Sequence, residues 1–193
     1  MQRTHHGRLW LHALAGTLAL AIVGFMVIRA STAAFFDTTV NTGNGFAAGT
    51  VTLTDDDTTT ALFDLANLAP GDGATSCIAV TYSGSLDATV KLYAAVTGGT
   101  GLDSYLDVTV ERGSGGSFAD CGAFTVDEVV YSGTLSGLAA TAQDFGSGLG
   151  AWAAIGGAPD DVVTYRVAVT LQDDDAAQGL DASASFTWEA QNS

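Results

Sequence analysis

VTYRVAVTL, residues 163–171, places an apolar side chain at every second position. Two sets of side chains alternate along it, with Val163, Tyr165, Val167, Val169 and Leu171 in one and Thr164, Arg166 and Thr170 in the other. A period of two is typical of a β-strand, because successive side chains point to opposite faces of the sheet. The stretch therefore predicts a strand with one face on a hydrophobic core.

The same alternation recurs along the chain. It is clear at residues 88–96, 106–111 and 182–189, and weaker at 35–42, 49–54, 61–65, 77–82 and 124–131. The expected total is about nine strands. Turn sequences such as Pro70-Gly71 and Gly98-Gly99 separate the runs. Many short strands with glycine turns predict an all-β fold, a two-sheet jelly-roll-like β-sandwich.

Residues 135–158 form the least regular stretch and are rich in Gly and Ala. We interpret the stretch as a long loop packed across one end of the sandwich. A short helix around residues 138–145 is the alternative. Gly146, Gly148 and Gly150 would weaken any helix that continued past that point.

The chain opens with a hydrophobic leader. Two arginines precede an apolar run at residues 9–28, and the small residues Thr32 and Ala34 follow it. A basic segment, an apolar segment and small residues at positions −3 and −1 are typical of a secretory signal peptide. We predict a signal peptide at residues 1–34, cut between Ala34 and Phe35 by a signal peptidase.

A retained membrane anchor is the alternative to cleavage. A run of about 20 apolar residues can span a bilayer, and Arg29 could act as a stop-transfer charge. After cleavage, residues 35–193 would be secreted, and only the uncleaved leader would meet a membrane. About 160 residues fit one domain with a contiguous core, so we expect a single domain.

Charge is distributed unevenly between the leader and the rest. All 21 acidic residues follow residue 34, but only three of the six bases do, namely Lys91, Arg112 and Arg166. Such an acidic surface repels nucleic acid and anionic lipid. The composition therefore argues against a nucleic-acid partner and predicts a well-solvated exterior.

Two cysteines, Cys77 and Cys121, lie in the part predicted to be exported. An oxidising exterior favours a disulfide between them. Two separate buried thiols are the alternative.

Three acidic clusters fall in predicted turns: Asp55-Asp56-Asp57, Asp160-Asp161 and Asp173-Asp174-Asp175. Carboxylate oxygens suit calcium, but no cluster has the spacing of an EF-hand loop. Solvated turns are one interpretation. The other is a calcium site where two turns meet, with Asp55, Asp57, Asp173 and Asp175 as candidate ligands.

Several segments occur in a characteristic order. They are AFFD at 34–37, FAAGTVTL at 46–53, LANLAPGD at 65–72, Gly179-Leu180, and FTWEAQ at 186–191. In that order and spacing, the chain resembles the TasA/camelysin family. The resemblance implies an exported subunit of biofilm matrix fibres or surface filaments, processed by a dedicated signal peptidase.

The resemblance also implies a way of assembly, in which the freed amino-terminal segment adds as a strand to the next subunit. Residues 35–46 are the candidate donor strand. Phe35 would be the new terminus, and Phe36, Thr38 and Val40 could enter a neighbour's groove by β-augmentation. The partners would be copies of the same chain and an accessory anchoring protein. Alternatively, residues 35–42 are the first strand of their own domain.

Some camelysin-like proteins are classed as metallopeptidases, but the residues argue against an enzyme. Catalytic zinc needs three protein ligands and a water, commonly from a His-Glu-x-x-His helix. All three histidines lie within the leader, and the chain has no such motif. We expect a structural protein that is not an enzyme. Its one candidate cofactor is calcium, bound by the acidic turns described above.

A monomeric surface adhesin or carbohydrate-binding module is the alternative function, because jelly rolls also serve as lectins. Its binding face would carry exposed aromatic residues, for which Tyr105, Tyr131 and Trp152 are candidates. The same three residues could equally lie in the core of a sandwich.

Overall fold

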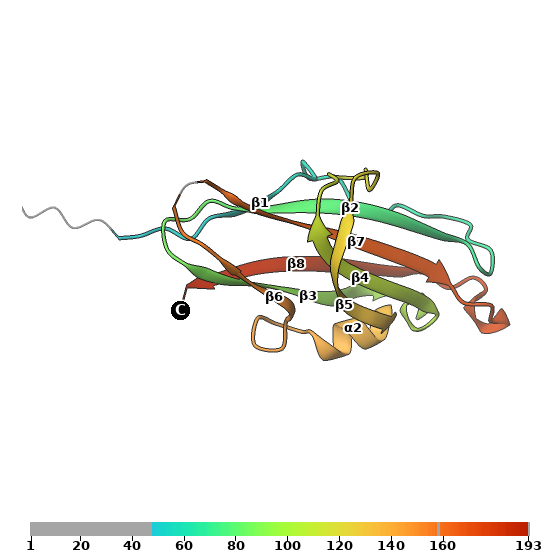
Figure 1. The fold of residues 1–193 in the computed structure, drawn as a ribbon. Coiled ribbons are helices and arrows are strands. Elements are labelled where there is room, and N and C mark those ends of the chain that lie inside the picture. Colours follow the sequence, from blue (N-terminus) through green and yellow to red (C-terminus); the bar gives the residue numbers. More distant parts are fainter. Residues whose placement is uncertain (1–47, 158, 193) are drawn as a thin grey trace, which may run out of the picture. The chain divides into compact units, whose positions relative to one another are not determined.

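The computed structural model describes residues 48–157 and 159–192 (Figure 1). The predicted leader, its cleavage site at Ala34 and Phe35, and the candidate donor strand at 35–46 lie outside the described residues. The part described contains eight strands, one α-helix and two short 3-10 helices. It belongs to one compact unit that starts at Ala48.

The strands form two antiparallel sheets, which confirms the predicted all-β sandwich. The five-stranded sheet has the order β1 (Leu53–Asp55), β2 (Gly73–Tyr82), β7 (Asp161–Leu171), β4 (Leu106–Ser114) and β5 (Thr125–Thr134). The three-stranded sheet has the order β6 (Leu149–Ala154), β3 (Ala88–Gly99) and β8 (Ala182–Asn192). The helices are η1 (Leu102–Ser104), α2 (Leu135–Thr141) and η2 (Asp175–Ala177).

The alternating stretch at 163–171 is β7, the middle strand of the larger sheet. Tyr165, Val167 and Val169 are buried, and their side chains belong to the core. The Tyr165 ring lies against Trp188 of β8, with 5.3 Å between ring centroids. This contact joins the two sheets, because one ring comes from each.

Both sheets contribute inward-facing side chains to one core. Fully buried members are Val80 and Tyr82 from β2, Val90 and Leu92 from β3, Val108 and Val110 from β4, and Leu138 from α2. The α-helix packs beside β3, β4 and β5. All of these residues lie after Ala48, so the unit carries its own hydrophobic core.

The prediction of a strand at residues 61–65 was wrong. In the structure this segment is an irregular part of the connection between β1 and β2. Its residues make no backbone hydrogen bond to a strand of the described part. Leu62 and Phe63 instead pack against the core, so adjacent apolar side chains serve one surface rather than alternating between two.

The prediction of a long loop at 135–158 was also wrong. The α-helix α2 begins at Leu135, where the Thr134 hydroxyl accepts a hydrogen bond of 3.1 Å from the Gly137 N–H and caps the helix. The strand β6 then pairs with β3, and its Trp152 and Ala154 are buried. The alternative of a short helix was closer, although the helix starts three residues before the predicted position.

A tight turn between α2 and β6 is held by hydrogen bonds. The Ser147 N–H donates to Asp144 Oδ1 over 2.9 Å, and the Ser147 hydroxyl donates to the same atom over 2.9 Å. These bonds lower the pKa of Asp144. Beside this turn, Lys91 Nζ of β3 lies 4.8 Å from the centroid of the Phe145 ring, in cation–π geometry.

The first described residues and the last ones lie at the same end of the unit (Figure 1). The Thr50 carbonyl accepts a hydrogen bond of 2.8 Å from the Ser85 N–H, next to the turn between β2 and β3. Ala88, which follows that turn, pairs with Asn192 at the end of β8. The opposite end contains the Pro70-Gly71 turn and η2.

Burial in the core raises the pKa of Tyr165 to about 12. An unfolded tyrosine has a pKa of about 10. The contribution of Tyr165 to the unfolding free energy is therefore fully present below about pH 10, and it is lost as the pH rises towards about 12. That difference in pKa corresponds to about 3 kcal/mol. We expect Tyr165→Phe to remove this loss, measured as the fall in unfolding free energy between about pH 9 and 12. Equal falls in the variant and the wild type would contradict the prediction.

Candidate assembly groove

A groove opens between the two sheets beside β8, with a volume of about 450 Å³. We call it the β8 groove. One wall is formed by Ala184, Phe186 and Trp188 of β8, and the facing wall by Ile78 of β2 and Val169 of β7. Residues 57–68, here called the strap, lie over it. The groove is therefore a gap in the sandwich that no strand of the described part fills.

The strand β8 is an edge strand of the three-stranded sheet. It pairs with β3 along its whole length, and no described strand pairs with its other edge. Phe186 and Trp188 point inward but are only half-buried. An edge strand of 11 residues with half-covered apolar side chains can accept another strand.

A second hollow of about 500 Å³ continues the groove towards one end of the unit. The two hollows share Leu65, Leu68 and Leu102, and the second one extends to Pro70 and Leu180. The Pro70-Gly71 turn lies at the end opposite to Ala48 and Asn192. The groove therefore runs from the middle of the unit towards the end away from Ala48.

The predicted donor residues Phe35, Phe36, Thr38 and Val40 lie outside the described residues, as does Ala34. The structure thus provides a surface that could receive such a strand, and it gives no position for the strand itself.

The two cysteines, Cys77 and Cys121, are joined by a disulfide with 5.4 Å between their Cα atoms. Cys77 is fully buried in β2, and Cys121 lies in the loop between β4 and β5. The Ala119 N–H of that loop donates to the Cys77 carbonyl over 3.0 Å. The bridge therefore ties the β4–β5 loop to the edge of β2 beyond the end of β1.

Asp56 reinforces the same junction. Its carboxylate accepts one hydrogen bond of 2.8 Å from the Ala79 N–H of β2 and another of 2.7 Å from the Phe118 N–H of the loop. From the sequence, Asp56 was expected in a solvated turn, and this role was not predicted. A carboxylate that follows a strand directly was the available signal, but its partner lies 62 residues away along the chain.

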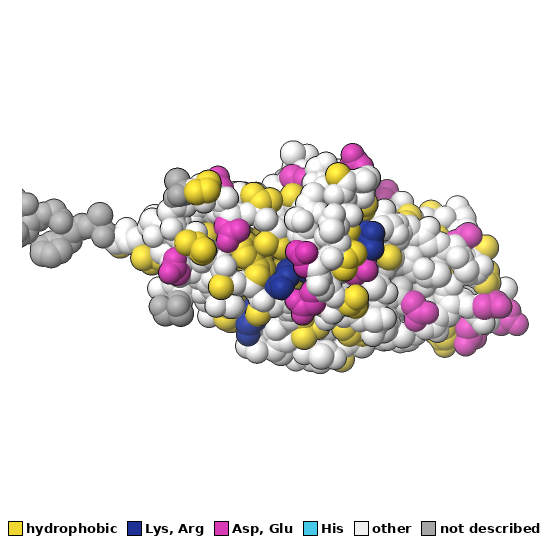
Figure 2. Space-filling model, in the orientation of Figure 1, with side chains coloured by type: hydrophobic (Ala, Val, Ile, Leu, Met, Phe, Trp, Pro, Cys, Tyr) yellow, Lys and Arg dark blue, Asp and Glu magenta, His cyan; other side chains and the backbone are white. Residues whose placement is uncertain are grey.

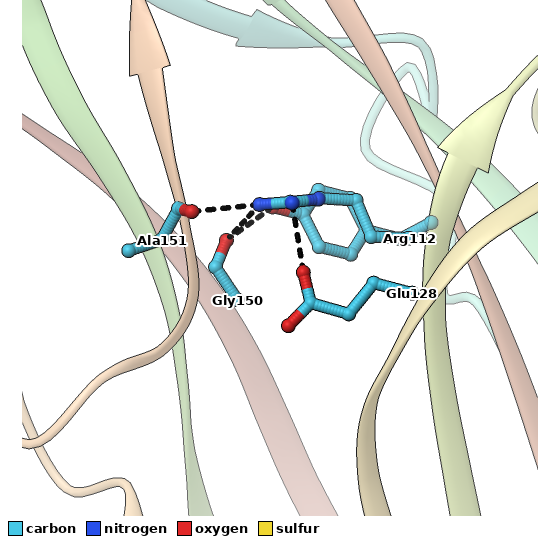
Figure 3. A network of polar contacts seen from close by, with 5 residues as sticks. Arg112, Glu128, Gly150 and Ala151 are labelled. Carbon is cyan, nitrogen blue, oxygen red and sulfur yellow. Dashed lines mark hydrogen bonds and ion pairs between the residues drawn. The ribbon is translucent and has the colours of Figure 1, made fainter.

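Arg112 of β4 closes the margin of the sandwich near β6 (Figure 3). Its Nη1 donates to the carbonyls of Gly150 and Ala151 over 3.0 and 2.7 Å, and its Nη2 lies 2.7 Å from the Glu128 carboxylate. One guanidinium thus connects β4 and β5 of the larger sheet with β6 of the smaller one. The sequence showed Arg112 only as one of the few bases.

The candidate calcium ligands are engaged in local turns. Asp55 Oδ1 accepts from the Asp57 N–H over 3.3 Å, and Asp57 Oδ1 accepts from the Thr59 N–H over 2.6 Å. Burial is the main cause that raises the pKa of Asp55. Asp173 lies before η2 and Asp175 is its first residue, at an end where Figure 2 shows acidic side chains gathered. No three acidic, cysteine or histidine residues within 48–157 and 159–192 are grouped as ligands of one ion.

The aromatic candidates for a binding face do not form one. Trp152 is buried, with 8% of its surface exposed. Tyr131 is half-buried, and its hydroxyl donates to the Thr134 carbonyl over 2.9 Å. Tyr105 is half-buried after η1. Trp152 belongs to the hydrophobic core, and Tyr131 packs against it.

Residues 11–100 match the camelysin metallo-endopeptidase family. The match confirms the predicted resemblance over that range, which ends just after β3. No curated protein matches the chain.

The camelysin match covers β1, the strap, β2 and β3, but it does not reach β8. The β8 groove and its edge strand are therefore assigned from the structure alone. The family's description names a metallo-endopeptidase, but the described part of this chain offers no grouped ligand set for the metal.

Proposed function

We propose that the protein is a structural subunit that polymerises by strand addition. In this proposal, residues 35–46 of one copy enter the β8 groove of the next copy. The observation that carries the proposal is a groove with Phe186 and Trp188 on its wall, beside the edge of β8 that no described strand pairs with. The camelysin match supports the assignment at the level of the family.

The chemistry of the donor segment fits the groove. Phe35, Phe36 and Val40 are apolar, as are Phe186 and Trp188 on the groove wall. The 12 residues of the donor segment would span about 40 Å as a strand, close to the length of the 11-residue β8. Backbone N–H and C=O groups of the donor would pair with the free edge of β8 and extend its sheet.

The positions of the two ends support head-to-tail growth. The described chain begins at one end of the unit, and the hollow beyond the groove opens at the other. A contact between two different surfaces of identical copies does not close on itself when it translates along one axis. Repeated strand addition would therefore produce a filament.

Export is part of the same proposal. We infer that residues 1–34 are a signal peptide, that a signal peptidase cuts after Ala34, and that the product is secreted to the cell surface or matrix. The camelysin match supports an extracellular or surface location. Among the described residues, none of the helices has the length and hydropathy needed to cross a bilayer. An accessory anchoring protein would attach the filament.

We further infer that the subunit is not a peptidase. No histidine follows residue 34, and zinc catalysis needs three protein ligands in one place. Hydrolysis of casein by the chain that starts at Phe35, abolished by a chelator, would contradict this inference.

The assembly contact is tested by comparing two chains in negative-stain electron microscopy at equal concentration. One begins at Phe35 and the other at Gly43, so that the second lacks residues 35–42. We expect filaments only from the first, because the second lacks Phe36, Thr38 and Val40, the side chains proposed to enter the groove. Filaments from both would place the contact elsewhere, and filaments from neither would favour the monomeric adhesin.

The receiving side is tested by placing a charge in the groove. Ala184→Glu puts a carboxylate on the apolar wall, and we expect filament formation to stop because that charge would have to be buried beside the donor. Ser185→Glu is the matched control, since Ser185 is the next residue on β8 and its side chain is exposed on the opposite face. Equal loss in both variants would contradict the groove assignment.

A further inference from the structure

We propose that the strap, residues 57–68, occupies the β8 groove in the free subunit and leaves it when a neighbour's strand enters. This inference rests on the proposed function and adds its regulation: the strap acts as a built-in competitor of the donor strand. The groove is lined by the strap and β8 together, so a strand that pairs with the free edge of β8 needs the space that the strap covers.

Side-chain contacts hold the strap in place. Leu62, Phe63 and Leu68 are half-buried, and Leu62 and Phe63 pack against the core. The side chains between them, including Asp64 and Leu65, are exposed. The strap therefore packs at the groove through a few apolar side chains, as a donor strand would, but it covers the groove incompletely.

Backbone hydrogen bonds are missing from the middle of the strap. Residues 61–68 neither donate nor accept a hydrogen bond within the described part of the chain. An added strand would pair its backbone with the free edge of β8, which the strap leaves unpaired. When the donor strand replaces the strap, a segment without backbone hydrogen bonds to β8 gives way to a strand that makes them.

Backbone conformation also disfavours the closed strap. Four described residues other than glycine have positive φ, and three of them lie on the strap: Thr58 at 50°, Thr59 at 69° and Asn67 at 55°. Positive φ is uncommon outside glycine and is especially unfavourable for a β-branched residue such as threonine. Opening the strap would release these residues to ordinary conformations.

Both ends of the strap are fixed, so it can open without unfolding the sheets. Asp56 anchors the start through its bonds to β2 and to the β4–β5 loop. After the strap, the Ala69 N–H donates to Asp72 over 2.8 Å and the Gly71 N–H donates to the Leu171 carbonyl over 2.9 Å. The segment between these anchors is of the kind that opens locally with low cost.

The test measures binding of a labelled peptide with the sequence of residues 35–46 to the unit that begins at Ala48, by fluorescence anisotropy. This unit carries its own core and lacks a donor strand. Phe63→Ser removes a strap anchor, and we expect binding about tenfold tighter because more of the protein is in the open state. Thr59→Gly relieves the positive φ of the closed strap, and we expect binding several-fold weaker.

Val129→Ser is the matched control, because Val129 is 57% exposed on β5, an edge strand of the larger sheet, and should leave binding unchanged. Hydrogen exchange of the wild type gives a second measurement that needs no variant. On addition of the peptide, we expect slower exchange in β8, whose unpaired amides gain partners, and no slowing in residues 61–68, whose amides make no hydrogen bonds in the closed strap either.

The outcomes separate this inference from the proposed function. Peptide binding that Phe63→Ser weakens, or exchange that slows in the strap, would show that the strap forms a wall of the site, and would overturn the inference alone. Absence of peptide binding to every variant would overturn strand addition together with the strap.

Discussion

Replacing Cys77 and Cys121 with alanine is expected to lower the unfolding free energy by about 4 kcal/mol. The bridge closes a loop with a sequence separation of 44 residues, and such a loop restricts the unfolded chain strongly. It also fixes the β4–β5 loop against β2, where Ala119 and Asp56 make their hydrogen bonds. Urea unfolding of both proteins, monitored by circular dichroism, gives the difference.

The reduced wild type is the matched control for this double variant. It has the same open loop and both sulfur atoms, so its unfolding free energy should fall to that of the variant. A reduced protein as stable as the oxidised one would contradict the prediction, because the bridge would then not restrict the unfolded state.

Arg112→Met is expected to lower the unfolding free energy by about 3 kcal/mol. The substitution keeps a long side chain but removes the donors to the Gly150 and Ala151 carbonyls. It also leaves Glu128 without its partner. Hydrogen bonds from a charged donor are stronger than neutral ones, and two of these bonds connect the sheets. Thermal and urea unfolding would measure the loss.

Glu128→Gln separates the ion pair from the carbonyl contacts. The Glu128 side chain is 49% exposed, and ion pairs near solvent contribute only about 0–1 kcal/mol. We therefore expect this variant to lose less than about 1 kcal/mol. A loss equal to that of Arg112→Met would mean that the ion pair, rather than the contact with β6, stabilises this margin.

The sequence predicted best where a strand has one buried face. The alternation at 163–171 became β7, and those at 88–96, 106–111 and 182–189 became β3, β4 and β8. It failed at 61–65, because neighbouring apolar residues there pack on one surface without a pairing partner. It also missed β6, where Gly and Ala leave only Trp152 to mark the buried face.

The candidate site could not be predicted in the same way. The β8 groove depends on the order of strands in two sheets, and the alternation within β8 does not tell which of its edges is free. Asp56 and Arg112 bind backbone groups that are distant in the sequence, so their roles appear only once the chain is folded. The donor residues Phe35 and Phe36 remain predictions.

Lys91 is the one lysine side chain that an amine-reactive reagent can modify in this protein. Lys91 is the only lysine in the sequence. It lies on β3, with its Nζ over the ring of Phe145, and it is not among the residues that line the β8 groove. In a chain that starts at Phe35, an amine-reactive dye would find only this side chain and the terminal α-amino group. Donor and acceptor dyes on successive copies would then report energy transfer as a filament grows.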